Sequence, residues 1–169
     1  LYTRGEAAFI QQQGPIRIGI FSQRPPFSYY DEGRHAYQGI TLDILDLIAQ
    51  KSGLTFEYVP IPRGDLALDY LKNNQIDLSS GMVVTNSRLA NTSLHLSAPY
   101  FAGQMDFAGK KGTQHDAAKS CRVAIPADAK GIYEYLQENY PEYEIITYTD
   151  SESCMQAVDQ GEADMMIQN

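Results

Sequence analysis

Cysteine and histidine, the usual ligands of structural zinc, are scarce in this sequence, which has only two cysteines and three histidines among its 169 residues. Neither cysteine has a metal-like partner at short spacing, and the histidines (His35, His95 and His115) are scattered along the chain. A structural zinc site needs four clustered ligands. We therefore expect neither a metal site nor a cofactor.

Basic residues are also few. The sequence has 13 lysines and arginines against 21 aspartates and glutamates, a net charge of -8 and a pI of about 4.7. The only basic cluster is Lys110–Lys111, whereas nucleic-acid-binding proteins carry a basic face or stripe. An acidic surface is also repelled by anionic lipid headgroups. We exclude nucleic acid as a partner and interpret the charge chiefly as a contribution to solubility.

Long apolar runs are absent. No run approaches the roughly 18 residues of a membrane-spanning helix, and no signal peptide opens the sequence. The second absence carries no information about the compartment, because such a segment is removed from a mature protein. With 43% hydrophobic and 20% charged residues, the composition is that of a globular protein. This length suffices for one domain or two small lobes.

Strand and helix patterns alternate in the first half of the chain. Ile16, Ile18 and Ile20 recur with the period of a strand. From Ile40 the apolar residues recur with helical spacing; Thr41 is a candidate N-cap, and Gly53 a stop signal. Further patterns predict a strand over 54–59, a helix over 65–71 and strands over 76–78 and 105–108, with irregular chain over 24–38 and a loop over 81–99.

The second half repeats this outline. Strands are predicted over 121–125, 144–148 and 164–167. One helix between them stops before Pro141. Thr149 and Glu152 fit a capping box that opens the next helix, which ends at Gly161.

A strand–helix–strand–helix–strand unit thus occurs twice, and each copy ends on a polar stop, an acid and a strand. This alternation predicts two α/β lobes with mostly parallel sheets. We expect lobe 1 over 1–108 and lobe 2 over 109–169, with a connector over 109–120. Ligands bind at the carboxyl ends of parallel strands, which places a cleft at the loops 21–30, 79–88, 126–131 and 167–169.

Four stretches carry a resemblance to a known family. They are Pro25-Pro26-Phe27-Ser28-Tyr29, Gly39-Ile40-Thr41-Leu42-Asp43-Ile44-Leu45, Gly81-Met82-Val83-Val84-Thr85-Asn86-Ser87-Arg88 and Leu96-Ser97-Ala98-Pro99-Tyr100-Phe101. With these motifs, residues 15–169 resemble bacterial solute-binding protein family 3, which has the type II periplasmic-binding fold, a two-lobed α/β clamp. Residues 1–13 also resemble the short helix that precedes this domain in sensor histidine kinases and related receptors. Such domains continue past the second crossover with one or two further helices, so we expect this chain to stop short of them.

The resemblance implies a ligand site around Arg88, which corresponds to the arginine that grips a ligand carboxylate in amino-acid-binding members. A guanidinium fork matches a carboxylate bidentately. The alternative is a surface arginine paired with Asp65 or Asp69. Gly81 corresponds to a position where the backbone approaches the ligand, or it is a plain turn glycine. Its neighbours Ser80 and Met82 complete this part of the predicted site.

Four positions depart from the amino-acid-binding pattern. Val83 replaces a hydroxyl residue, Arg24 replaces an aromatic one, Ala129 beside Lys130 replaces a threonine, and Asn169 replaces an aspartate that pairs with the ligand ammonium. A neutral amide cannot supply the charge that an ammonium needs in a desolvated cleft. Arg24 and Lys130 therefore favour an anionic or polar ligand, unless both are simply solvated.

Aromatic residues cluster at the first cleft loop, and Tyr29 and Tyr30 are the better candidates for the ligand site, because Phe21 and Phe27 equally suit core packing. The two cysteines, Cys121 and Cys154, are either a disulfide or two buried thiols. An extracytoplasmic compartment favours the bond, whereas each position also suits a small buried thiol.

The expected function is binding of a small polar or anionic molecule outside the cytoplasm. The sensor module of a membrane-anchored histidine kinase or diguanylate cyclase is the first hypothesis, and the substrate-binding component of an ABC importer is the alternative. A homodimer is a candidate assembly. No nucleophile–base pair or converging pair of carboxylates stands out, so we expect no enzymatic activity.

Overall fold

The computed structural model describes residues 2–91, 93–113 and 120–168. The chain divides into two compact units, Leu1–Met82 and Val83–Asn169. Within the described residues, no helix is long and apolar enough to cross a membrane.

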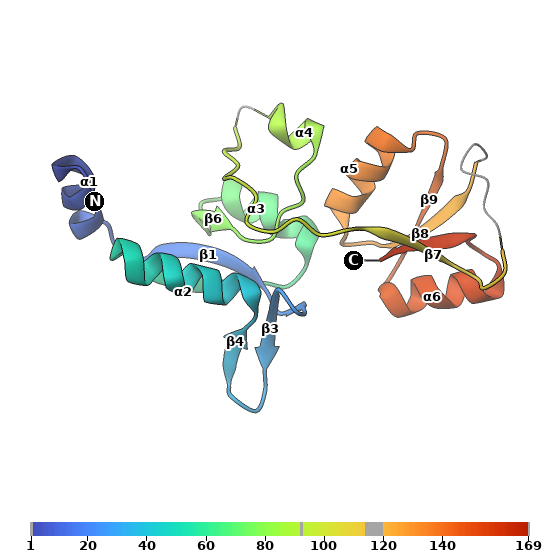
Figure 1. Ribbon diagram of the computed structural model, residues 1–169, viewed down its shortest axis with the longest axis horizontal. Coiled ribbons are helices and arrows are strands. Elements are labelled where there is room, and N and C mark those ends of the chain that lie inside the picture. The colour runs from blue at the N-terminus through green and yellow to red at the C-terminus, as the bar shows by residue number, and fades with distance from the viewer. Residues whose placement is uncertain (1, 92, 114–119, 169) are drawn as a thin grey trace. The chain divides into compact units, whose positions relative to one another are not determined.

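The first unit is built on a parallel sheet in the order β5–β1–β6, formed by β1 (Ile16–Phe21), β5 (Phe56–Ile61) and β6 (Leu78–Ser79). Helix α2 (Ile40–Ser52) runs alongside β1 (Figure 1). The short helix η1 (Gly64–Leu66) leads into α3 (Ala67–Lys72).

The two faces of β1 pack against different helices. Ile18 and Ile20 lie in one core cluster with Leu42 of α2, and Phe21 lies in the other with Ala67 of α3. Successive strand residues point to opposite faces, so the alternation of isoleucines in the sequence covers only the α2 side. On the other face, the missing side chain of Gly19 leaves space for Ile76, since a Cβ at Gly19 would lie 2.6 Å from Cδ1 of Ile76.

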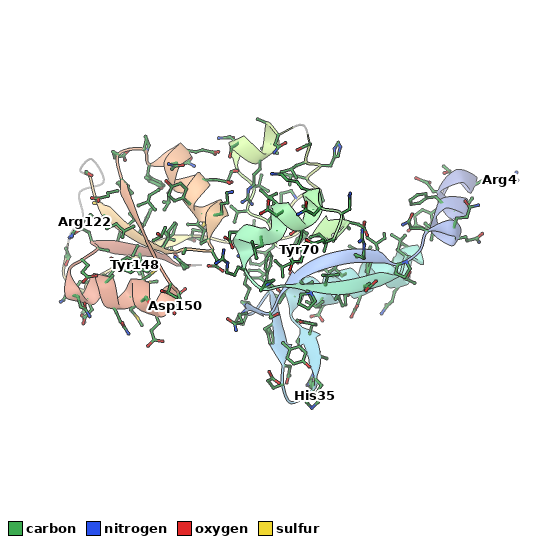
Figure 2. All side chains as sticks on the ribbon, turned by 180° about the vertical axis from the view of Figure 1, so that it is seen from behind. Arg4, His35, Tyr70, Arg122, Tyr148 and Asp150 are labelled. Atoms are coloured by element: carbon green, nitrogen blue, oxygen red, sulfur yellow. The ribbon has the colours of Figure 1, made fainter. Side chains whose placement is uncertain are left out.

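Residues 24–38 form more regular structure than the sequence predicts. β2 (Gln23–Arg24), β3 (Ser28–Asp31) and β4 (Ala36–Gln38) make a small antiparallel sheet, and His35 marks the tip of the β3–β4 hairpin (Figure 2). The tyrosines of this hairpin were not recognised from the sequence as strand residues. Aromatic residues pair favourably across strands, and the rings of Tyr30 and Tyr37 lie edge to face, 5.1 Å apart.

The second unit is built on the sheet β7–β10–β8–β9, formed by β7 (Asp106–Gly109), β8 (Arg122–Pro126), β9 (Glu144–Tyr148) and β10 (Met165–Gln168). Strands β8, β9 and β10 are parallel, and β7 pairs antiparallel with β10. The sequence analysis grouped the strand at 105–108 with the first lobe, whereas its main partner is in this sheet.

Two helices cover opposite faces of this sheet, α5 (Lys130–Asn139) and α6 (Ser151–Gln160) (Figure 1). The expected repeat is confirmed: β1–α2–β5–α3–β6 and β8–α5–β9–α6–β10 have the same element order, and in both the first strand lies between the other two. The lobe boundary between 108 and 109 stays a prediction. The predicted connector includes residues 114–119, which lie outside the described part of the chain.

Cys121 and Cys154 do not form the disulfide that was considered from the sequence. Cys121 lies in the core cluster on the α5 side with Val123 and Leu136, and Cys154 lies in the cluster on the α6 side with Ala124. The sheet separates the two sulfurs. Alternation along the strand puts Cys121 and Val123 on one face and Ala124 on the other, and α6 packs on the face of Ala124.

Two predicted helix caps are also wrong. Gly39 is the N-cap of α2 and makes no side-chain cap bond, while Thr41 is buried inside the helix. The N-cap of α6 is Asp150, whose carboxylate accepts a hydrogen bond from the Ser153 N–H at 2.8 Å. Aspartate is among the best N-cap residues, and it lies one position after the predicted Thr149.

Candidate functional site

In the first unit, Ser80 and Gly81 follow the carboxyl end of β6, as predicted. The Ser80 hydroxyl is buried and donates to the Gly19 carbonyl at 2.8 Å, which ties this turn to β1. Gly81 has a φ of +66°, which glycine adopts without strain. Both residues thus shape the turn after β6, and their role in ligand binding stays a prediction. Met82 follows, half-buried.

The other predicted site residues of this unit lie on the small antiparallel sheet. The Arg24 guanidinium lies 4.1 Å from the centre of the Phe21 ring, a cation–π contact. Tyr29 is half-buried on β3, and its neighbour Tyr30 is exposed. Arg24 and the tyrosines therefore belong to one hairpin sheet that begins directly after β1.

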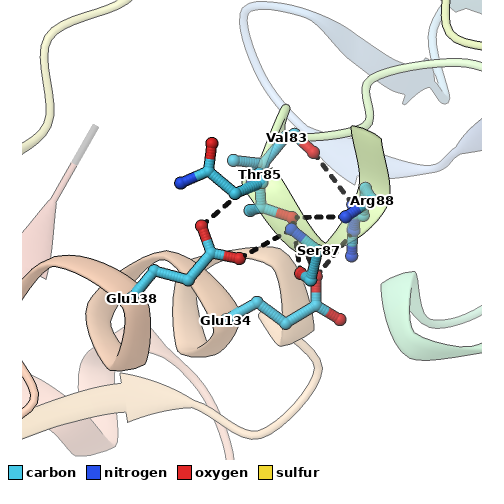
Figure 3. Close-up of polar contacts among 7 residues, drawn as sticks. Val83, Thr85, Ser87, Arg88, Glu134 and Glu138 are labelled. Carbon is cyan, nitrogen blue, oxygen red and sulfur yellow. Dashed lines mark hydrogen bonds and ion pairs between the residues drawn. The ribbon is translucent and has the colours of Figure 1, made fainter. Parts of the chain in front are cut away.

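In the second unit, Arg88 is the central polar residue. It lies on the one-turn helix α4 (Asn86–Leu89), whose N-cap Thr85 accepts a hydrogen bond from the Arg88 N–H. The residue is only 9% exposed. Its Nε donates to the Glu134 carboxylate at 2.7 Å, and its Nη1 donates to the Val83 carbonyl at 3.1 Å (Figure 3).

Two carboxylates of α5 hold this segment. Oε2 of Glu134 also accepts a weak hydrogen bond from the Thr85 hydroxyl at 3.4 Å. One turn later, the Glu138 carboxylate accepts the N–H groups of Ser87 and Asn86, each at 2.9 Å (Figure 3). The hydrogen bonds from Ser87 and then Asn86 lower the pKa of Glu138 below its ordinary value. Glu138 thus accepts N–H groups of the first turn of α4, which have no partner within a helix.

The alternative interpretation of Arg88 as a surface arginine is wrong. Arg88 is buried and pairs with Glu134, whereas Asp65, one of the aspartates considered for it, pairs with Arg63 at 2.6 Å. The sequence analysis missed Glu134 and Glu138 altogether. Their spacing of four residues, which puts two acids on one helix face, was the signal that could have found them.

The start of α5 lies against the same segment. Gly131 is buried, and a Cβ there would lie 2.9 Å from Cβ of Val83 and 3.3 Å from Nη1 of Arg88. The predicted site residue Lys130 precedes it and is exposed. Asn169, also predicted for the site, lies outside the described residues. The placement of Arg88 in a cleft near Ser80 and Gly81 stays a prediction, because those residues belong to the other unit.

The part of the chain that the structure describes contains no group of three or more His, Cys, Asp or Glu side chains able to hold a metal ion.

Comparison with known proteins identifies relatives over most of the chain. The model of the bacterial extracellular solute-binding proteins, family 3, matches residues 16–127. The virulence sensor protein BvgS of Bordetella bronchiseptica is 31% identical over 158 residues, which are 90% of this chain but only 12% of that protein. The sensor protein EvgS of Escherichia coli K12 is 25% identical over 170 residues, 98% of this chain and 14% of the relative.

Solved structures share the fold. The periplasmic VFT2 domain of Bordetella pertussis BvgS superimposes with a TM-score of 0.77 at 21% identity, covering 99% of this chain and 72% of that one. An ancestral amino acid-binding protein, a precursor of cyclohexadienyl dehydratase, gives 0.68 at 26% identity and covers 96% and 73%. Both matches cover nearly the whole chain, including both compact units.

Proposed function

Because this chain belongs to the bacterial extracellular solute-binding proteins, family 3, we propose that it is the ligand-binding sensor module of a membrane-anchored signalling receptor. The domain has the two-lobed α/β fold of type II periplasmic-binding proteins and is extracytoplasmic. The curated relatives that support the sensor role are themselves named sensor proteins, and the chain spans 12–14% of their length. The output domain would lie in the remainder of such a receptor.

Arg88 is the observation on which the ligand-binding proposal rests. Its side chain is 10% exposed, and its Nη2 donates to no acceptor among residues 2–91, 93–113 and 120–168. Buried donors are nearly always satisfied, and an arginine carries five N–H donors that carbonyl and carboxylate oxygens match. We assign Nη2 to an oxygen atom of a small polar ligand.

The proposal includes no catalytic step. The carboxylates beside Arg88 accept hydrogen bonds from this chain, Oε2 of Glu134 from the guanidinium and both oxygens of Glu138 from backbone N–H groups. A general base must lie within hydrogen-bond reach of the substrate proton that it removes, and we assign that role to neither glutamate. Incubation with prephenate-like acids tests this part, and turnover would contradict it.

A transport role is the second candidate, since the solved structures with this fold include a cysteine-binding protein from Campylobacter jejuni, matched with a TM-score of 0.68. A longer reading frame with transmembrane and output domains supports the sensor role, and a reading frame that ends with the binding domain supports transport.

A thermal-shift screen of metabolites tests ligand binding directly, because a ligand at 100 times its Kd adds about 2.7 kcal/mol of stability. We expect one class of small polar solutes to raise the Tm of the wild type and not of Arg88→Gln. Arg34→Gln is the control, since Arg34 lies on the β3–β4 hairpin with its side chain 72% exposed. A hit that stabilises Arg88→Gln equally would remove Arg88 from the site.

A further inference from the structure

One face of α5 is occupied by the segment that carries Arg88. Gly131, Glu134 and Glu138 follow one another at spacings of three and four residues, which places them on the same side of a helix. Gly131 lets the helix start approach Val83 and Arg88, Glu134 binds the guanidinium, and Glu138 binds two N–H groups of α4.

The ion pair between Arg88 and Glu134 is monodentate: a single guanidinium nitrogen donates to a single carboxylate oxygen. Nε donates to Oε2, while neither Nη2 of Arg88 nor Oε1 of Glu134 has a hydrogen-bond partner within the described parts of the chain. By contrast, an arginine donates to both carboxylate oxygens in the ion pairs of Arg17 with Asp77, Arg63 with Asp65 and Arg122 with Asp164. An open donor and an open acceptor thus remain on one pair, whose side chains are 10% and 21% exposed.

We propose that Glu134 is a specificity-determining residue that cancels the charge of Arg88, so that this arginine prefers a neutral group with a carbonyl beside an N–H, such as an amide, over a free carboxylate. The inference rests on the proposed role of Arg88 in ligand binding. A carbonyl oxygen accepts from Nη2, and an N–H donates to Oε1 of Glu134. A ligand carboxylate would instead lie about 4 Å from a like charge, a repulsion that lowers affinity roughly tenfold or more.

The test compares acetate with acetamide, which have the same shape and differ in charge. Each is titrated into the wild-type protein and its variants at pH 7, and binding is followed by NMR chemical shifts. The wild type is expected to bind acetamide at least as tightly as acetate. Glu134→Gln removes the negative charge and is expected to shift the affinity ratio about tenfold toward acetate.

Glu138→Gln is the matched control. It makes the same change in net charge one turn along α5, but Glu138 contacts the backbone of Asn86 and Ser87, so the ratio should stay at the wild-type value. Glu134→Asp keeps the charge and should keep the preference. Circular dichroism checks folding, and Glu134→Ala replaces the glutamine variant if that variant unfolds.

An unchanged ratio in Glu134→Gln, an equal shift in Glu138→Gln, or no acetate binding by Glu134→Gln would each overturn the inference. Failure of the proposed function gives a different result: acetate would still bind the Arg88→Gln/Glu134→Gln double variant, which shows that the anion does not use Arg88.

Discussion

Arg17 forms a bidentate ion pair with Asp77, in which Nε donates to Oδ2 at 3.1 Å and Nη2 donates to Oδ1 at 2.7 Å. The Arg17 N–H donates to the same carboxylate at 2.9 Å. Arg122 and Asp164 repeat this arrangement in the second unit, with distances of 3.2, 2.8 and 2.8 Å. Each pair joins the first strand of the repeated strand–helix–strand–helix–strand unit to the residue just before its third strand. The two units therefore share an ion pair as well as a topology.

Removal of the ion pair between Arg17 and Asp77 is expected to lower the stability of the first unit. Asp77→Asn keeps the shape of the side chain and loses its charge, and because the pair is partly exposed we expect a loss of about 1 kcal/mol in the free energy of unfolding. Urea denaturation measures it. Glu32→Gln, an exposed acid in the β3–β4 turn, is the control, and an equal loss there would show a general charge effect.

The ion pair between Arg17 and Asp77 should also make the free energy of unfolding depend on pH. Hydrogen bonds from the side chain and backbone of Arg17 lower the pKa of Asp77 below its ordinary value of 3.8. A lowered folded-state pKa stabilises the fold above the unfolded-state pKa of about 3.9, and this contribution is lost as the pH falls through the folded-state value. Unfolding at pH 7 and at pH 3 should therefore differ less in Asp77→Asn than in the wild type. An identical difference in both proteins would contradict the role of Asp77.

The contact between α5 and Arg88 can be tested sterically. Gly131→Ala places a methyl group 2.9 Å from Cβ of Val83, and we expect the free energy of unfolding to fall by roughly 1–3 kcal/mol. Gly5→Ala is a matched control, since Gly5 is likewise the second residue of its helix, α1 (Arg4–Gln12), but its Cβ would meet nothing within 4 Å. Because alanine favours a helix more than glycine does, the free energy of unfolding of this control should rise by up to about 1 kcal/mol. Equal stability of the two variants in urea would contradict the close packing at Gly131.

Both cysteines are expected to react as thiols once the chain is unfolded. Cys154 is fully buried, and burial raises its pKa to about 11, so the folded protein should resist alkylation there at pH 8 because the thiolate is scarce. Thiol labelling of the unfolded, unreduced protein should find two reactive groups per chain. If no thiol reacted, the two cysteines would have to be joined by a disulfide, which would contradict the separation of the sulfurs by the sheet.

The sequence by itself determined the repeated α/β order, because the alternation of strand and helix periods is a local property of each segment. It also pointed to the family through four motifs, one of which ends in Arg88. Local patterns missed the β3–β4 hairpin, since its tyrosines and polar residues carry no clear apolar alternation, and they placed the caps of α2 and α6 one or two residues off.

Only the tertiary structure decided which residues meet across the chain. Nothing local links Arg88 to Glu134, which is 46 residues away, because the contact depends on how α4 packs on α5. Cys121 and Cys154 show the same limit: each suits a buried position, but the face of the sheet that each one occupies depends on the pairing of β8 and on the side that α6 covers. Periodicity is encoded residue by residue, whereas partners are chosen by packing.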